Sequence, residues 1–218
     1  SSVGASVFQT NFGSVTYHDL TIDAASGHKL DALLLVPENA TAENPAPAIV
    51  VSHGWYNNRE MQDLNYVEYA RRGYVVLAIS MYGHGDSEVI GSNTWWNDEN
   101  NANGLYDAVK HVAKLPFVDD SRIGVTGHSN GGLACKEAVR LDKLAETPLI
   151  ASVLLVSCDP IYTEEDTVTN TFGRRVYDTS NDTYTNFFGN RDVGFIACEY
   201  DEFFNCVSNG DGTWTAAR

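Results

Sequence analysis

The stretch Gly127-His128-Ser129-Asn130-Gly131-Gly132, written GHSNGG, follows directly on the apolar run Arg122-Ile123-Gly124-Val125-Thr126. The run predicts a strand and the residues after the stretch predict a helix, so Ser129 falls where a strand passes into a helix. A sharp turn there presents a serine hydroxyl clear of the backbone and requires small residues two positions before and after it. Gly127 and Gly131 meet that requirement. We therefore predict that Ser129 is a nucleophile.

Short apolar runs alternate with helical periodicity along most of the chain. The predicted strands are 14–22, 29–36, 48–52, 74–80, 122–126, 150–157 and 193–198, and the predicted helices are 61–72, 103–115 and 131–145. The first two strands read as an antiparallel hairpin, and the later ones require parallel pairing with right-handed crossovers. The fold class is therefore α/β, a doubly wound and mostly parallel sheet with an N-terminal hairpin. A length of 218 residues suits one domain, 1–218.

Two segments break this rhythm. Residues 159–192 are rich in Thr, Asn and Asp and have few periodic apolar positions. We expect them to form an insertion or lid over the strand ends. The tail 208–218, SNGDGTWTAAR, is expected to be unstructured.

The composition excludes several classes of partner. The chain has 14 basic and 29 acidic residues, a net charge of -15, which repels nucleic acid and anionic lipid. No apolar run approaches the roughly 18 residues of a membrane-spanning helix. Cysteine is too sparse for a disulfide scaffold and has no close metal-binding spacing, and Cys158 and Cys198 are expected to be buried thiols. Few lysines and two triplets that fit glycosylation acceptors give a slight preference for an extracytoplasmic location.

Two further elements accompany the serine motif. His53-Gly54-Trp55 follows the strand 48–52, and a glycine-rich loop, Tyr82 to Ser87, follows the strand 74–80. With GHSNGG, these elements resemble the α/β-hydrolase superfamily, over most of the chain as far as Phe204. The resemblance implies an oxyanion hole made by the backbone N–H groups of Trp55 and Asn130. It also implies that His53 and Gly54 shape the oxyanion loop, that the glycine-rich loop braces the nucleophile loop, and that neither metal nor organic cofactor takes part.

The acid of a catalytic triad is expected on the loop after the strand that follows the insertion. The segment Cys198-Glu199-Tyr200-Asp201-Glu202 offers several carboxylates, and the pattern of the superfamily selects Asp201. A carboxylate there would orient a histidine and stabilise its imidazolium. Asp159, after the preceding strand, is the alternative position.

The base is missing from its expected place. The triad order of this fold is Ser, acid, His, yet no histidine follows Asp201. The six histidines, all before Ser129, are His18, His28, His53, His84, His111 and His128. We expect each of them to be structural, and the base, with the last strand and helix of the fold, to lie beyond Arg218. Two alternatives stay open, a non-catalytic binding module and a site completed by a partner chain.

The predicted reaction is hydrolysis of a carboxylic ester by acyl transfer through Ser129. The motifs are similar to those of dienelactone-hydrolase-like esterases and of prolyl-oligopeptidase-type peptidases, so a serine peptidase is the alternative. The predicted partners are a small ester or peptide substrate and the remainder of the polypeptide itself. The aromatic pairs Trp55-Tyr56 and Trp95-Trp96 are candidates for lining an acyl pocket.

Overall fold

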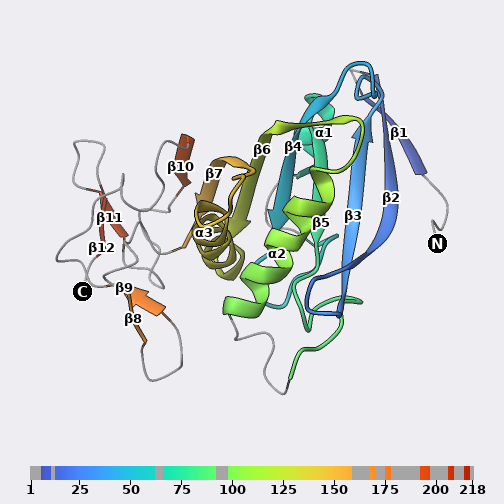
Figure 1. The fold of residues 1–218 in the computed structure, drawn as a ribbon. Helices are drawn as coiled ribbons and strands as arrows, with labels where there is room; N and C mark the ends of the chain where they lie inside the picture. Colours follow the sequence, from blue (N-terminus) through green and yellow to red (C-terminus); the bar gives the residue numbers. More distant parts are fainter. Residues whose placement is uncertain are drawn as a thin grey trace.

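One mixed sheet of eight strands organises the protein. The computed structural model describes residues 13–61, 66–91 and 98–158, and outside these ranges only the backbone of short strands. The sheet order is β1-β2-β3-β5-β4-β6-β7-β10 (Figure 1). The strands of this sheet are β1 (Ser6–Thr10), β2 (Gly13–Asp23), β3 (Lys29–Pro37), β4 (Ala46–Ser52), β5 (Val75–Ile79), β6 (Val118–His128), β7 (Ile150–Val156) and β10 (Asp192–Ile196).

The sheet changes from antiparallel to parallel between β3 and β5. β2 and β3 form the predicted hairpin, with Ile22 opposite Leu30, and β3 pairs antiparallel with β5. From β5 onward, β4, β6, β7 and β10 are all parallel. The fold class is therefore confirmed. β1, which pairs with β2 at the edge of the sheet, is an additional strand that the sequence analysis did not predict.

Helices cover both faces of the sheet. α2 (Asp98–Val112) and α3 (Asn130–Lys143) pack together over one face, and α1 (Tyr66–Arg71) lies on the other (Figure 1). The i, i+3, i+4, i+7 spacing predicted for α2 is confirmed by the four fully buried side chains Leu105, Ala108, Val109 and Val112. Two hydrophobic clusters follow, one under α2 and α3 and one under α1, which is what a doubly wound sheet requires.

The helix predicted over 61–72 is wrong at its start. Met61 lies outside α1 and is 65% exposed, although its spacing predicted an inward position. The side-chain oxygen of Asn58 accepts the N–H groups of Glu60, at 3.0 Å, and of Met61, at 2.8 Å. These two hydrogen bonds hold Glu60 and Met61 in a bend, and the described helix begins at Tyr66. Residues 62–65 lie outside the described residues.

The tail is also different from its prediction. β11 (Cys206–Ser208) and β12 (Trp214–Ala216) pair antiparallel, so the tail is not wholly unstructured. In the predicted insertion, β8 (Thr167–Thr169) pairs with β9 (Arg175–Tyr177), and most other residues of the insertion lie outside the described part of the chain. Three-residue strands are too short to produce a periodic pattern, which is why the sequence did not reveal them.

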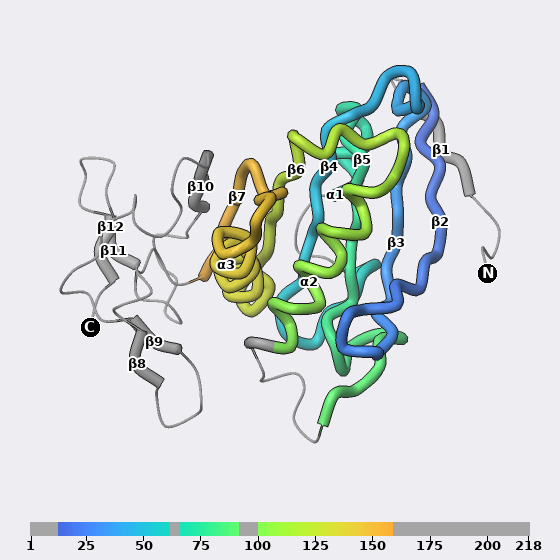
Figure 2. The backbone as a smooth tube through the Cα atoms, in the orientation of Figure 1, coloured from blue at the N-terminus to red at the C-terminus, as the bar shows by residue number. Residues whose placement is uncertain are grey.

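The order of the strands creates a switch point beside β4. The chain runs from β4 through α1 to β5 on one side, then crosses back through α2 to β6 on the other side (Figure 2). In open α/β sheets, ligands bind outside the carboxyl ends of the strands at such a point. The loop after β4 and the turn after β6 are therefore neighbours at this edge. Within the described residues, no helix is long and apolar enough to cross a membrane.

Candidate active site

Ser129 is the single residue between the end of β6 and the start of α3. Its backbone angles are φ 52° and ψ -115°, a conformation that L-residues rarely adopt. Its N–H donates to the Val156 carbonyl of β7 at 2.9 Å, and its carbonyl accepts the Leu133 N–H of α3 at 3.2 Å. The side chain makes no capping hydrogen bond to the helix. The backbone thus fixes Ser129 on both sides and leaves its hydroxyl out of the helix cap.

Two glycines allow the turn to close. A Cβ on Gly127 would stand 2.7 Å from the Gly132 nitrogen and closer still to the Gly131 carbonyl. A Cβ on Gly131 would stand 2.5 Å from the His53 carbonyl oxygen and closer still to that of Ser52. All of these are backbone atoms, which cannot swing away as a side chain can. The packing of the turn therefore requires glycine at both positions, in line with the small residues that the turn was predicted to need.

The two predicted oxyanion donors belong to segments that meet at this contact. Gly131 rests against the carbonyls of Ser52 and His53, so the start of α3 lies directly on the end of β4. Asn130 is the first residue of α3, where backbone N–H groups have no partner within the helix and the helix dipole favours negative charge. Trp55 follows three residues after β4. The arrangement can therefore offer N–H groups from two loops to a developing oxyanion.

His53 holds the loop after β4 in shape. The imidazole is fully buried, and its Nε2 accepts the Met81 N–H at 2.9 Å. Nδ1 therefore carries the proton and donates a hydrogen bond to the Gly54 carbonyl at 2.6 Å. Because backbone groups occupy both ring nitrogens, His53 acts on the shape of this loop and not on a substrate.

A buried arginine anchors the far end of that loop. The Arg59 guanidinium pairs with Asp31 of β3 at 3.1 Å and with Asp19 of β2 at 2.8 Å, and it donates to the Ala32 carbonyl at 2.6 Å. The second oxygen of Asp31 accepts the hydroxyl of Ser80 at 3.0 Å. Burial raises the pKa of the Asp31 carboxyl, and the nearby Arg59 charge opposes that shift. The sequence did not predict this network, because its members are far apart along the chain and form no local motif.

The glycine-rich loop after β5 contributes to this network. Ser87 accepts the Asp31 N–H at 2.8 Å and donates to the Ser80 carbonyl at 2.6 Å. His84 lies with its ring 4.9 Å from that of His53. The contacts described for this loop thus run to β3 and to the loop after β4, whereas the sequence predicted a brace for the nucleophile loop. The predicted contact with the nucleophile loop stays a prediction.

Three non-glycine residues in the described part of the chain have positive φ. They are Tyr56 at 61°, Ser129 at 52° and Ser157 at 45°. Each lies just beyond the carboxyl end of a parallel strand, after β4, β6 and β7 respectively. Backbone strain gathers at functional sites, where the surrounding structure must hold it. The backbone strain therefore indicates that this edge of the sheet is the functional one, and the sequence alone does not reveal the strain.

The structure assigns positions to all six histidines. His18 lies in β2, His28 in the turn that joins β2 to β3, and His111 in α2. His84 and His53 are occupied with backbone carbonyls and with each other. His128 is the last residue of β6 and lies next to Ser129. His18 lies within β2 and His111 in the last turn of α2, away from the carboxyl edge of the sheet. His28 lies at that edge beside Tyr82, with ring centroids 6.3 Å apart, but β5 and β4 separate its hairpin from β6 and Ser129.

Other predicted residues lie outside the described residues. Asp201, Asp159 and the pair Trp95-Trp96 are among them. In the part of the chain that the structure describes, no group of three or more His, Cys, Asp or Glu side chains is arranged to hold a metal ion. Cys158 is buried, as predicted, while the side chain of Cys198 is not described.

Sheet order, crossovers and the strained serine at the strand-to-helix turn define an α/β hydrolase. The family model of the X-Pro dipeptidyl-peptidases (S15 family) matches residues 26–183. The chain therefore belongs to the S15 family, a serine hydrolase family within the α/β-hydrolase superfamily. None of the curated proteins compared with the chain matches it.

Solved structures agree on the fold. A hypothetical protein from Pseudomonas aeruginosa is 28% identical, with a TM-score of 0.58, over 66% of this chain and 43% of its own. Acetyl xylan esterase 1 from a Thermoanaerobacterium species is 24% identical, with a TM-score of 0.55, over 71% and 51%. A bacterial heroin esterase is 22% identical, with a TM-score of 0.55, over 71% and 48%. The chain thus spans about half the length of these structures.

Proposed function

We propose that this protein is a serine hydrolase that acts by acyl transfer through Ser129. The observation that carries the proposal is the conformation of Ser129, held at positive φ between β6 and α3 by close backbone contacts at Gly127 and Gly131. Strain of this kind is retained where it presents a reactive group. Membership of the S15 family supports the same class of reaction.

In the proposed mechanism, the Ser129 hydroxyl attacks the substrate carbonyl while a histidine takes its proton. The backbone N–H groups of Trp55 and Asn130 stabilise the negative charge that develops on the carbonyl oxygen. The histidine then protonates the leaving group, and an acyl-serine remains. Water, deprotonated by the same histidine, attacks this ester and releases the acid and free Ser129. Asp201 is the residue proposed to orient the histidine.

We place the base outside residues 1–218. Both nitrogens of His53 contact the backbone, and His84 packs on His53 and donates from Nδ1 to the Tyr82 carbonyl. His18 and His111 lie away from the carboxyl edge of the sheet, and the hairpin of His28 is separated from β6 by β5 and β4. His128 precedes Ser129 at a turn that directs neighbouring side chains to different sides. Residues 1–218 by themselves should therefore hydrolyse p-nitrophenyl acetate no faster than their Ser129→Ala variant.

The favoured substrate is a carboxylic ester. Tyr56 and Met61, both exposed, put apolar surface on the loop that carries the oxyanion donor, which suits an uncharged alkyl or aryl group. The second candidate is a peptide with proline at its second position, the substrate that the name of the family denotes. Both reactions would pass through the same acyl-serine.

A covalent probe tests the nucleophile directly. A fluorophosphonate should label the full-length protein at Ser129. Labelling should be lost in Ser129→Ala but kept in Ser121→Ala, because Ser121 is an exposed serine near the start of β6. Labelling that survives in Ser129→Ala would reject the proposal. Turnover of p-nitrophenyl esters against that of an Xaa-Pro p-nitroanilide then decides between the two substrates.

A further inference from the structure

Tyr56 occupies a turn position that disfavours it. The Asn57 N–H donates to the Gly54 carbonyl at 3.4 Å and closes a turn with Trp55 and Tyr56 at its centre. Of these two central residues, only Tyr56 has positive φ, at 61°. Positive φ at the second central position is typical of a type II turn, which favours glycine or asparagine there. Tyrosine is strained at this position because its Cβ crowds the backbone.

Burial of the side chain does not compensate this strain. Tyr56 is 79% exposed, and the contact of its ring with Trp55 is edge-on, with ring centroids 6.3 Å apart. An aromatic ring stabilises a fold mainly through the apolar surface that it removes from water. A ring that stays in water contributes little of this kind. Burial of apolar surface is therefore not the reason for tyrosine at this position.

The position of Tyr56 connects it to the reactive serine. His53 ties the loop to Met81 on one side of Tyr56, and Arg59 ties it to Asp31 on the other. The carbonyl of His53 also touches Gly131, two residues after Ser129. Tyr56 thus projects from a loop that is fixed at both ends and packed on the nucleophile turn. A side chain on such a rigid support can contact a ligand with little loss of conformational freedom.

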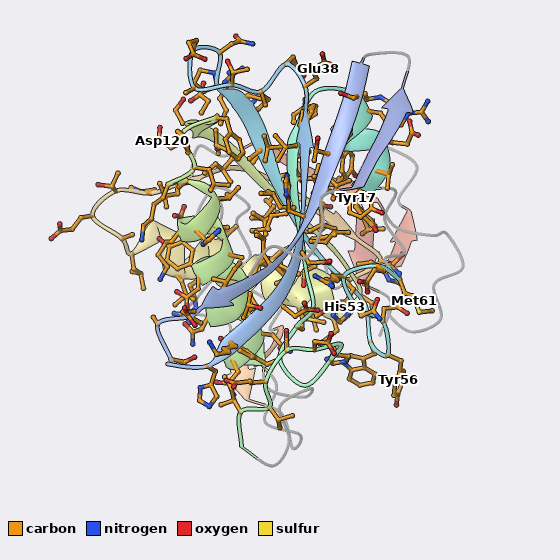
Figure 3. All side chains as sticks on the ribbon, turned by 90° about the vertical axis from the view of Figure 1, so that its right-hand side faces the viewer. Tyr17, Glu38, His53, Tyr56, Met61 and Asp120 are labelled. Carbon is orange, nitrogen blue, oxygen red and sulfur yellow. The ribbon has the colours of Figure 1, made fainter. Side chains whose placement is uncertain are left out.

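A second exposed apolar side chain belongs to the same loop. Met61 is 65% exposed, and Figure 3 shows Tyr56 and Met61 at the same end of the molecule as His53. Large apolar groups exposed together beside a reactive group are characteristic of binding surfaces. Their chemistry, one aromatic ring and one thioether, fits an apolar group, and the ring fits an aryl group best.

We propose that Tyr56 is a specificity-determining residue that contacts an aryl group on the acyl side of the substrate. This inference rests on the proposed function, because it requires a carbonyl held between Ser129 and the N–H of Trp55. Tyr56 follows Trp55 directly, so the acyl chain attached to that carbonyl passes close to the ring. The strain of the turn is the consequence of keeping an aromatic ring there.

The test compares two esters that share a leaving group, p-nitrophenyl phenylacetate and p-nitrophenyl acetate, on the full-length protein. In Tyr56→Asn, the ratio of kcat/KM for phenylacetate to that for acetate should fall about tenfold, mainly through KM, which is the size of effect expected for one aromatic contact. Tyr56→Phe keeps the ring and should keep most of the ratio. The melting temperature of Tyr56→Asn should be unchanged or rise by about 2 °C, since asparagine tolerates the turn.

Tyr74→Asn is the matched control, because Tyr74 is exposed just before β5, at the amino end of the parallel strands. It should leave the ratio unchanged. An unchanged ratio in Tyr56→Asn, with hydrolysis still dependent on Ser129, would overturn the role of Tyr56 alone. A lower melting temperature with equal loss on both esters would also overturn it, because the tyrosine would then be structural. If Ser129→Ala hydrolyses both esters as fast as the unmodified protein, the proposed function fails and this inference with it.

Discussion

At the scale of single residues, strain and close contact are concentrated at one edge of the sheet. Tyr56, Ser129 and Ser157 carry positive φ there, at a cost of about 1–3 kcal/mol each. Gly131 has no room for a side chain because the carbonyls of Ser52 and His53 touch it. These features do not favour folding by themselves. They are tolerated because burial of the hydrophobic core on both faces of the sheet offsets their free-energy cost.

Gly131→Ala tests whether this packing is as close as the structure indicates. Gly131 lies in the first turn of α3, where helix propensity alone predicts a gain of roughly 1 kcal/mol for alanine. The new methyl group would instead meet two carbonyl oxygens of the backbone, so we expect the free energy of unfolding to fall by about 2–3 kcal/mol. Urea denaturation measures the difference.

Gly124→Ala is the control for this prediction. Its methyl group would meet the Ser152 hydroxyl at 2.8 Å, and that side chain can rotate away. The loss should therefore be clearly smaller than for Gly131→Ala. Equal losses would show that the nucleophile turn has more room than its backbone contacts imply.

At the scale of elements, the loop after β4 is the best-supported irregular segment near the serine. His53 fixes its start through two backbone contacts, and Arg59 fixes its end through β2 and β3. The loop must hold the Trp55 N–H in place before the oxyanion forms, because a donor that has to move stabilises the transition state less. The ion-pair network is therefore a positioning device.

Arg59→Met tests this network. The Arg59 and Asp31 side chains are each only 11% exposed, so removal of the guanidinium leaves a buried carboxylate without its cation. Breaking a buried pair in this way is strongly destabilising, and we expect a loss of about 3 kcal/mol in the free energy of unfolding.

The same substitution at a surface arginine gives the comparison. Arg72 pairs with Glu68 on α1, and its side chain is 60% exposed. Arg72→Met should have a far smaller effect, because exposed ion pairs are weak. If both variants lose the same stability in urea, Arg59 is not a buried anchor.

At the scale of the whole molecule, neutral histidines connect stability to pH. Burial lowers the pKa of His84, and a hydrogen bond to the Tyr82 carbonyl partly opposes the shift. Burial also lowers the pKa of His111, and the charge of Lys114 adds to it. In both cases the unfolded chain binds a proton more readily than the folded chain. Stability from these groups is therefore present above the unfolded pKa of about 6.5 and is lost as the pH falls through the lower folded pKa.

The double variant His84→Gln, His111→Gln should show a flatter dependence on pH. Between pH 7 and 5.5, the melting temperature of the unmodified protein should fall, and that of the double variant should fall less, because glutamine binds no proton in this range. Calorimetry at several pH values measures both slopes. Parallel slopes would mean that neither histidine contributes to the acid sensitivity of the fold.

Much of the fold could be predicted from local patterns. The hairpin, the parallel strands, α2 and the glycines around Ser129 follow from periodicity and turn chemistry, which depend on neighbours in the chain. The predicted start of the helix was wrong at Met61, which lies in a bend whose N–H groups, those of Glu60 and Met61, donate to the Asn58 side chain. The prediction of an unstructured tail was wrong at β12, because a three-residue strand is defined by its pairing and leaves no local pattern in the sequence.

By itself, the sequence determined that this is an α/β hydrolase with a serine at a strand-to-helix turn, because that turn imposes small residues at fixed spacing. Only the tertiary structure decided what supports the site. Asp19, Asp31, Arg59 and Ser80 are far apart in the sequence and meet because β2, β3 and β5 are adjacent in the sheet. The strain at Tyr56 is likewise invisible in the sequence, because a φ angle is fixed by the turn that the fold closes around the residue.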